Sequence, residues 1–135
     1  MPKFAEKVNL EEPVDPEIIE IEKDDSFPMA YAFYLKLDSK PANIWKKIFK
    51  NEWKGSMFLL KREVKIADDR LRVVTAPDEI EGKVDWVRGL VDATNESIDK
   101  YNEELKKKEE MEKRKRNHQE ETIAEMRKRL KKILK

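Results

Sequence analysis

Two groups of cationic side chains are the residues in this sequence best spaced for chemistry. The candidate phosphate contacts are Lys46, Lys47, Lys50 and Lys54 in one segment, and Arg127 and Lys131 near the C-terminus. Spacings of one, three or four residues would gather each group on one side of a helix. Cations arranged in this way can neutralise the phosphates of a nucleic acid. Lysine-rich helix faces are also an ordinary solvated surface, so both interpretations stay open.

The sequence offers no other set of residues suited to catalysis or to a bound cofactor. It has no cysteine and a single histidine, His118, which excludes thiol nucleophiles, iron–sulfur clusters and zinc sites built on cysteine. The three glycines form neither a phosphate-binding loop nor a dinucleotide-binding motif. The pairs Asp24-Asp25 and Asp68-Asp69 lack the alternating spacing of a calcium loop and are typical of turns. We therefore predict a protein that is not an enzyme and that holds no catalytic site, metal or cofactor.

Aromatic side chains accompany the first lysine group. Trp45, Phe49 and Trp53 share one stripe of a helix predicted over residues 42–53, with lysines on the other side. The spacing favours a buried stripe. An exposed platform for base stacking or protein docking is the alternative, with Trp53, near Gly55, the most exposed of the three.

Three further segments have the alternation of strands. Residues 30–37 place Tyr31, Phe33 and Leu35 on one face, and residues 57–66 and 70–75 read as a hairpin that turns at Asp68-Asp69. Residues 18–22 are a candidate for a short edge strand. The acidic run of residues 11–17 is either a solubilising segment or a clamp that pairs with a basic helix.

A single long helix is predicted from Asp78 to the C-terminus. Its 58 residues would span about 87 Å at 1.5 Å per residue. Apolar residues follow a spacing of three and four from Ile80 to Leu105, lapse over residues 106–121, and return near the end. The residues predicted to contact a partner are Val91, Ile98, Tyr101, Leu105, Ile123, Met126, Leu130 and Ile133. The apolar residues near the C-terminus need something to cover them: a second copy, the chain itself folded back at a break near residues 115–119, or a different partner.

These elements predict an α+β protein with a small, mainly antiparallel sheet of three or four strands. The order strand, helix, strand, strand resembles part of the ferredoxin-like arrangement without its final strand. One helix would pack on the sheet, and the acidic N-terminal segment or a second subunit could cover the open edge. The predicted parts are an acidic, irregular lead-in over 1–28, an α+β head over 29–105, and a basic helical extension over 106–135.

Charge is abundant but balanced, with 44% charged residues and a formal net charge of +1. The sum hides four opposed blocks: residues 1–28 and 73–105 are acidic, and residues 29–72 and 106–135 are basic. A helix that starts acidic and ends basic would attract an antiparallel copy of itself.

We therefore expect a non-enzymatic oligomeric scaffold or adaptor, a dimer in the first instance, that assembles through the C-terminal helix or binds another protein there. The alternative is a nucleic-acid-binding regulator that uses the lysine face and the basic tail. No small-molecule substrate is evident. No apolar run is long enough for a membrane span and the N-terminus lacks the features of a signal peptide, so a cytoplasmic location is predicted.

Overall fold

The computed structural model describes residues 4–56 and 61–134. By Cα proximity the chain divides into two compact units. Residues 5–100, called the head below, form one unit, and the other contains the helical residues from Tyr101 onward. This differs from the predicted boundaries at residues 28 and 105, because the N-terminal segment from Ala5 packs in the same unit as the sheet.

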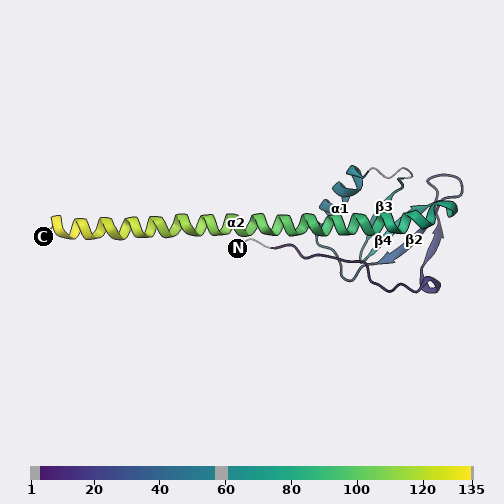
Figure 1. Cartoon of the computed structure of the whole chain (residues 1–135), viewed down its shortest axis with the longest axis horizontal. Helices are drawn as coiled ribbons and strands as arrows, with labels where there is room; N and C mark the ends of the chain where they lie inside the picture. The colour runs from purple at the N-terminus through teal and green to yellow at the C-terminus, as the bar shows by residue number, and fades with distance from the viewer. Residues whose placement is uncertain (1–3, 57–60, 135) are drawn as a thin grey trace. The chain divides into compact units, whose positions relative to one another are not determined.

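The head contains a four-stranded antiparallel sheet, which confirms the predicted α+β class (Figure 1). The strands are β1 (Ile21–Lys23), β2 (Tyr31–Lys36), β3 (Val64–Ala67) and β4 (Arg70–Thr75), in the spatial order β1-β2-β4-β3. This order matches the ferredoxin-like sheet, with β1 in the place of the missing final strand. The N-terminal segment therefore covers the edge of β2 that the sequence left open.

The first strand begins later than predicted. Residues Pro16–Ile18 form a turn of 3-10 helix in which the carboxylate of Asp15 accepts a hydrogen bond from the backbone N–H of Glu17. That turn occupies the first residue of the predicted strand, and pairing with β2 starts at Ile21, opposite Phe33.

The hairpin of β3 and β4 turns at Asp68-Asp69, as predicted. Asp68 has a φ of 62°, in the left-handed region that aspartate tolerates better than most residues. The predicted strand residues Phe58 and Leu60 lie outside the described part of the chain.

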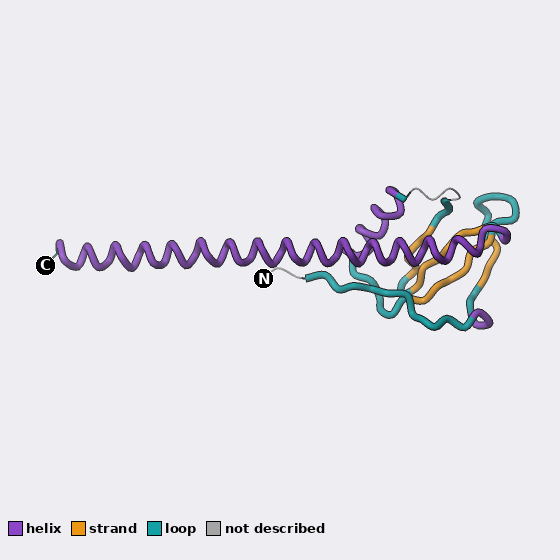
Figure 2. Tube along the Cα trace, in the orientation of Figure 1, coloured by secondary structure: helices purple, strands orange, loops and turns teal. Residues whose placement is uncertain are grey.

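Helix α1 (Asn43–Gly55) and the first part of α2 (Ile80–Ile133) cover one face of the sheet (Figure 2). Trp45 and Phe49 of α1 stack with ring centroids 5.2 Å apart and are buried, which confirms the core interpretation of that stripe. Helix α2 runs without interruption through residues 115–119, which excludes the fold-back among the three alternatives for its C-terminal apolar residues.

The core takes side chains from every layer of the head. It includes Val8, Phe33, Leu35, Leu37, Trp45, Phe49, Leu71, Val73, Val87, Leu90, Val91 and Ile98. Val91 and Ile98 are only 2% and 0% exposed, so the prediction that they contact a partner is wrong. The physical reason is that a stripe spaced by three and four residues fits a sheet as well as a second helix.

A buried amide joins three distant segments of the head. The side-chain oxygen of Asn95 on α2 accepts hydrogen bonds from the backbone N–H of Val8 at 3.1 Å and from the indole N–H of Trp45 at 2.9 Å. Its amide nitrogen donates to the Val8 carbonyl at 2.9 Å. Asn95 is 7% exposed and thus links the N-terminal segment, α1 and α2 in the buried part of the head.

Replacing Asn95 tests this role. In Asn95→Ala the two buried donors of Val8 and Trp45 lose their acceptor, and each unsatisfied group costs about 1–3 kcal/mol. We expect the free energy of unfolding to fall by about 2–5 kcal/mol in urea denaturation followed by circular dichroism. The control Glu96→Ala changes an exposed neighbour on the same helix and should shift it by less than about 0.5 kcal/mol. Equal effects of the two substitutions would contradict the assignment.

Candidate functional site

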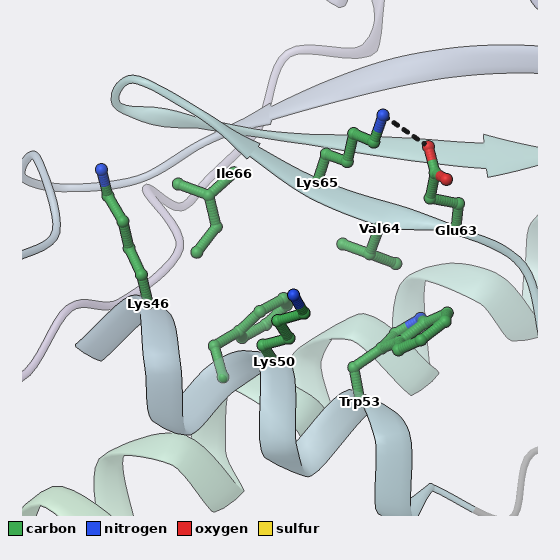
Figure 3. A pocket seen from close by; sticks show the side chains of 8 residues that line it. Lys46, Lys50, Trp53, Glu63, Val64, Lys65 and Ile66 are labelled. Atoms are coloured by element: carbon green, nitrogen blue, oxygen red, sulfur yellow. Dashed lines mark ion pairs between the residues drawn. The ribbon is translucent and has the colours of Figure 1, made fainter. Parts of the chain in front are cut away.

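A cleft of about 350 Å³ lies between α1 and β3 (Figure 3). Its lining residues are Lys46, Phe49, Lys50 and Trp53 from α1, and Glu63, Val64, Lys65 and Ile66 from β3 and the residue before it. In Figure 3 the α1 side chains stand opposite the strand. The cleft therefore has one wall made by a helix and one made by an edge strand of the sheet.

The cleft divides the predicted phosphate contacts of α1 into two pairs. Lys46 and Lys50 line it, whereas Lys47 and Lys54 are exposed elsewhere on the same helix. Lys65 of β3 pairs with Glu63 at 3.3 Å, and both side chains point to the other face of the sheet (Figure 3). The ammonium groups at the cleft are therefore those of Lys46 and Lys50.

The interior of the cleft is apolar. Trp53 is half-buried there, in line with its expected partial exposure, and its indole N–H donates to the carbonyl of Arg62 at 2.9 Å. The ammonium of Lys61 lies 4.3 Å from the centroid of the Trp53 ring, a cation–π contact. Both contacts hold the indole in one orientation, beside Val64 (Figure 3).

The backbone of β3 has an open side. The carbonyl of Glu63 accepts the backbone N–H of Val74, and the register places Lys65 opposite Arg72. Alternate residues of an antiparallel strand bond to the neighbouring strand, so the N–H and C=O groups of Val64 and Ile66 point away from β4. Among the described residues, no strand pairs with β3 on that side.

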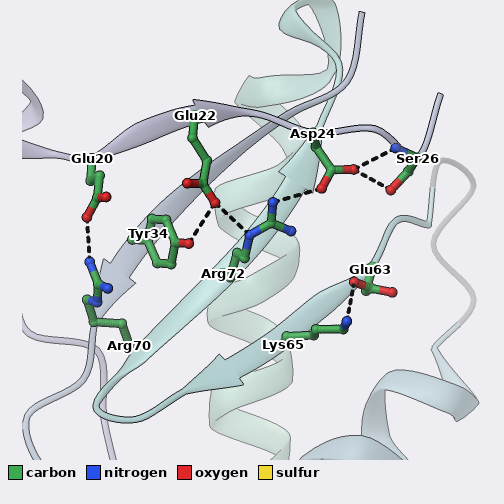
Figure 4. Close-up of polar contacts among 9 residues, drawn as sticks. All are labelled: Glu20, Glu22, Asp24, Ser26, Tyr34, Glu63, Lys65, Arg70 and Arg72. Atoms are coloured by element: carbon green, nitrogen blue, oxygen red, sulfur yellow. Dashed lines mark hydrogen bonds and ion pairs between the residues drawn. The ribbon is translucent and has the colours of Figure 1, made fainter. Parts of the chain in front are cut away.

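The opposite face of the sheet carries a network of ion pairs (Figure 4). Arg72 of β4 donates to Glu22 at 2.9 Å and to Asp24 at 2.8 Å, and Arg70 donates to Glu20 at 2.7 Å. The carboxylates come from β1 and its flanking residues. These carboxylates lie outside the acidic run of residues 11–17. Within that run, Glu11 pairs with Lys36 of β2 at 3.7 Å and Glu12 pairs with Arg88 of α2 at 2.8 Å.

The network shifts the acidity of its carboxyl groups. Hydrogen bonds from the Ser26 hydroxyl and from Arg72 lower the pKa of Asp24 to about 2. The Tyr34 hydroxyl, which donates to Glu22 at 2.7 Å, and Arg72 together lower the pKa of Glu22. Both carboxylates are held in their charged form.

A second cluster, which the sequence analysis did not predict, lies at the start of α2. Lys83 is 0% exposed, with its ammonium 3.4 Å from Glu79, which also binds Arg62 at 2.8 Å. Burial lowers the pKa of Lys83, and hydrogen bonding to Arg62 lowers that of Glu79. A buried lysine can serve as a catalytic amine, but this one has no surface open to a substrate. Through Glu79, these ion pairs hold the start of α2 against Arg62 in the segment before β3.

The helical unit from Tyr101 onward carries the remaining predicted partner contacts. Tyr101, Ile123, Met126, Leu130 and Ile133 are exposed and Leu105 is half-exposed. Leu105 and Ile123 are eighteen residues apart, which is five turns at 3.6 residues per turn, so both lie on one side of α2. Arg127 and Lys131, the other predicted phosphate contacts, are exposed in the same segment.

Comparison of the chain with protein-family profiles, with curated proteins and with solved structures found no significant match. No helix in the described part of the chain is both long and apolar enough to cross a membrane. Over residues 4–56 and 61–134, no group of three or more histidine or acidic side chains is arranged to hold a metal ion.

The lowered pKa of Asp24 predicts a pH dependence. Because folding favours its ionised form, the resulting stability is present above about pH 4, the ordinary range of an aspartate, and is lost as the pH falls towards 2. Thermal unfolding from pH 7 to pH 2 should show a steeper loss of melting temperature for the wild type than for Asp24→Asn. The exposed neighbour variant Asp25→Asn should follow the wild type. Coincident wild-type and Asp24→Asn profiles below pH 5 would contradict the role of this network.

Proposed function

We propose that the protein is a non-enzymatic scaffold or adaptor that self-associates through the helical unit of α2. The observation that carries the proposal is the exposed apolar stripe formed by Leu105, Ile123, Met126, Leu130 and Ile133, called the distal stripe below. Met126 is 56% exposed and Ile133 is 74% exposed, in a helical unit in which 20 of the other 29 side chains of residues 101–134 are charged.

Burial of the distal stripe supplies the driving force for association. A fully buried aliphatic side chain contributes about 1.5–3 kcal/mol relative to an exposed one. The ion pairs within this helix, such as Glu103 with Lys107 and Glu125 with Arg129, each contribute only about 0.3–0.5 kcal/mol. A helix with this sequence therefore gains most of its stability from a partner that covers its apolar residues.

Charge favours a second copy in the antiparallel orientation. Residues 103–112 carry five acidic and three basic side chains, whereas residues 113–134 carry nine basic and three acidic ones. A parallel pair would place the cations of residues 127–132 beside the same cations of the other copy. An antiparallel pair centred near Arg114 brings Leu105 against Ile123 and Glu112 against Arg116.

Self-association is tested by replacing two residues of the distal stripe. The double variant Leu105→Gln and Ile123→Gln keeps good helix formers and removes both apolar contacts of the antiparallel pair, four side chains in all. We expect its dissociation constant in sedimentation equilibrium to be at least about 100-fold higher than that of the wild type. The matched control, Lys128→Gln with Lys132→Gln, should change it by less than about tenfold. A wild type that is monomeric at tens of micromolar with its helix intact by circular dichroism would refute the proposal.

Orientation is tested with a spin label at Lys132→Cys, since the chain has no native cysteine. In the antiparallel pair the two labels are separated by about 36 residues along the helices, or roughly 54 Å at 1.5 Å per residue. Pulsed electron resonance should therefore give a long distance. A distance near the width of two helices, roughly 20 Å, would show a parallel pair.

Nucleic-acid binding through the lysine face of α1 and the basic tail is the alternative function. In its favour, Lys46, Lys47, Lys50, Lys54, Arg127 and Lys131 form no ion pair with the described residues. Against it, Arg62, Arg70 and Arg72 are already bound to carboxylates of the head. The hairpin arginines are thus neutralised by the chain itself, and the remaining cations are dispersed over two units.

A further inference from the structure

The cleft between α1 and β3 takes no part in the proposed self-association. We propose that it binds an extended acidic peptide segment of a partner protein, which adds to the open side of β3 as a fifth strand. The inference concerns the head alone and does not depend on the distal stripe.

The backbone of β3 provides the first half of the recognition. The outward N–H and C=O groups of Val64 and Ile66 form a short ladder that an extended peptide can extend by main-chain hydrogen bonds. A strand added to this edge lies along the mouth of the cleft, because Val64 and Ile66 also line it. The other edge of the sheet is β1, where Glu20 and Glu22 already hold the cations Arg70 and Arg72, so it offers an acidic strand no free cation of that pair.

The side chains of the cleft provide the second half. Alternate residues of an added strand point to opposite faces. One set would enter the apolar space beside Trp53 and Val64, where small aliphatic side chains fit. The ammonium groups of Lys46 and Lys50 on the helix wall then lie beside the peptide. The carboxylate of Glu63 points to the other face of the sheet with Lys65 and does not balance them, so the cleft selects a negatively charged segment.

The same features disfavour a single-stranded nucleic acid as the occupant. Sequence-independent binding of bases requires aromatic faces open for stacking. Trp53 is the aromatic side chain at the cleft surface, whereas Phe49 is buried. One face of the Trp53 ring is covered by the ammonium of Lys61, so the open ladder of β3 is the better-developed recognition element.

The test is fluorescence anisotropy with the full-length protein at low salt and a labelled peptide of sequence Thr-Glu-Thr-Val-Thr-Glu-Thr, whose acidic and aliphatic side chains share one face of the strand. We expect saturable binding that weakens at least about tenfold in Lys46→Glu with Lys50→Glu. The matched control, Lys47→Glu with Lys54→Glu, makes the same charge change on the same helix outside the cleft and should alter the affinity by less than about threefold. Equal weakening by both pairs, or no binding, would overturn the proposal.

Strand addition itself is tested on the peptide. N-methylation of the alternate amides that face β3 should abolish binding, whereas N-methylation of the other set should leave it within about threefold. Equal effects of the two sets would exclude a fifth strand. A labelled oligothymidine that binds as tightly as the peptide, with the same sensitivity to Lys46→Glu and Lys50→Glu, would identify a nucleic-acid site instead. Binding should persist in the distal-stripe variant, so this outcome is separate from that of self-association.

Discussion

Asn95 is the residue on which the arrangement of the head depends. Its buried amide exchanges hydrogen bonds with both backbone groups of Val8 and accepts the indole hydrogen of Trp45. A buried amide of this kind requires all its partners in place, since each missing bond leaves a polar group without water. The N-terminal segment, α1 and α2 can therefore meet in only one register. That register sets where α1 stands against β3, and so sets the cleft.

Much of the fold could be predicted because its local signals agree. Alternation identified β2 and β4, the stripe of Trp45 and Phe49 identified the buried side of α1, and the paired aspartates identified the hairpin turn. The prediction failed where the decisive contact is distant. Nothing near Val8 in the sequence indicates that it packs against Asn95, so the N-terminal segment read as an irregular lead-in.

The sequence also could not show which part of the apolar side of α2 is buried in the head. Val91 and Ile98 continue the same spacing as Leu105, yet the first two face the sheet and the third lies in the helical unit. The sequence pattern indicates that one side of a helix is apolar, but only the tertiary structure shows what covers that side. The candidate site was predicted only in part.

Lys46 and Lys50 were recognised as candidate phosphate contacts, but their separation from Lys47 and Lys54 depends on the position of β3. The buried Lys83 was missed because a lysine beside glutamates in the sequence is typical of the protein surface.

The placement of β1 has a consequence for how the head forms. In chain order β1 comes first, yet its partner β2 is held against a core that is complete only when α2 has reached Ile98. The bond between Val8 and Asn95 closes a loop of 87 residues. Such a loop adds little to the entropic cost compared with one half as long, but it raises the contact order, which slows folding. The segment before β2 is thus synthesised well before the part of α2 that it packs against, and until then its isoleucines and the edge of β2 are open to other chains.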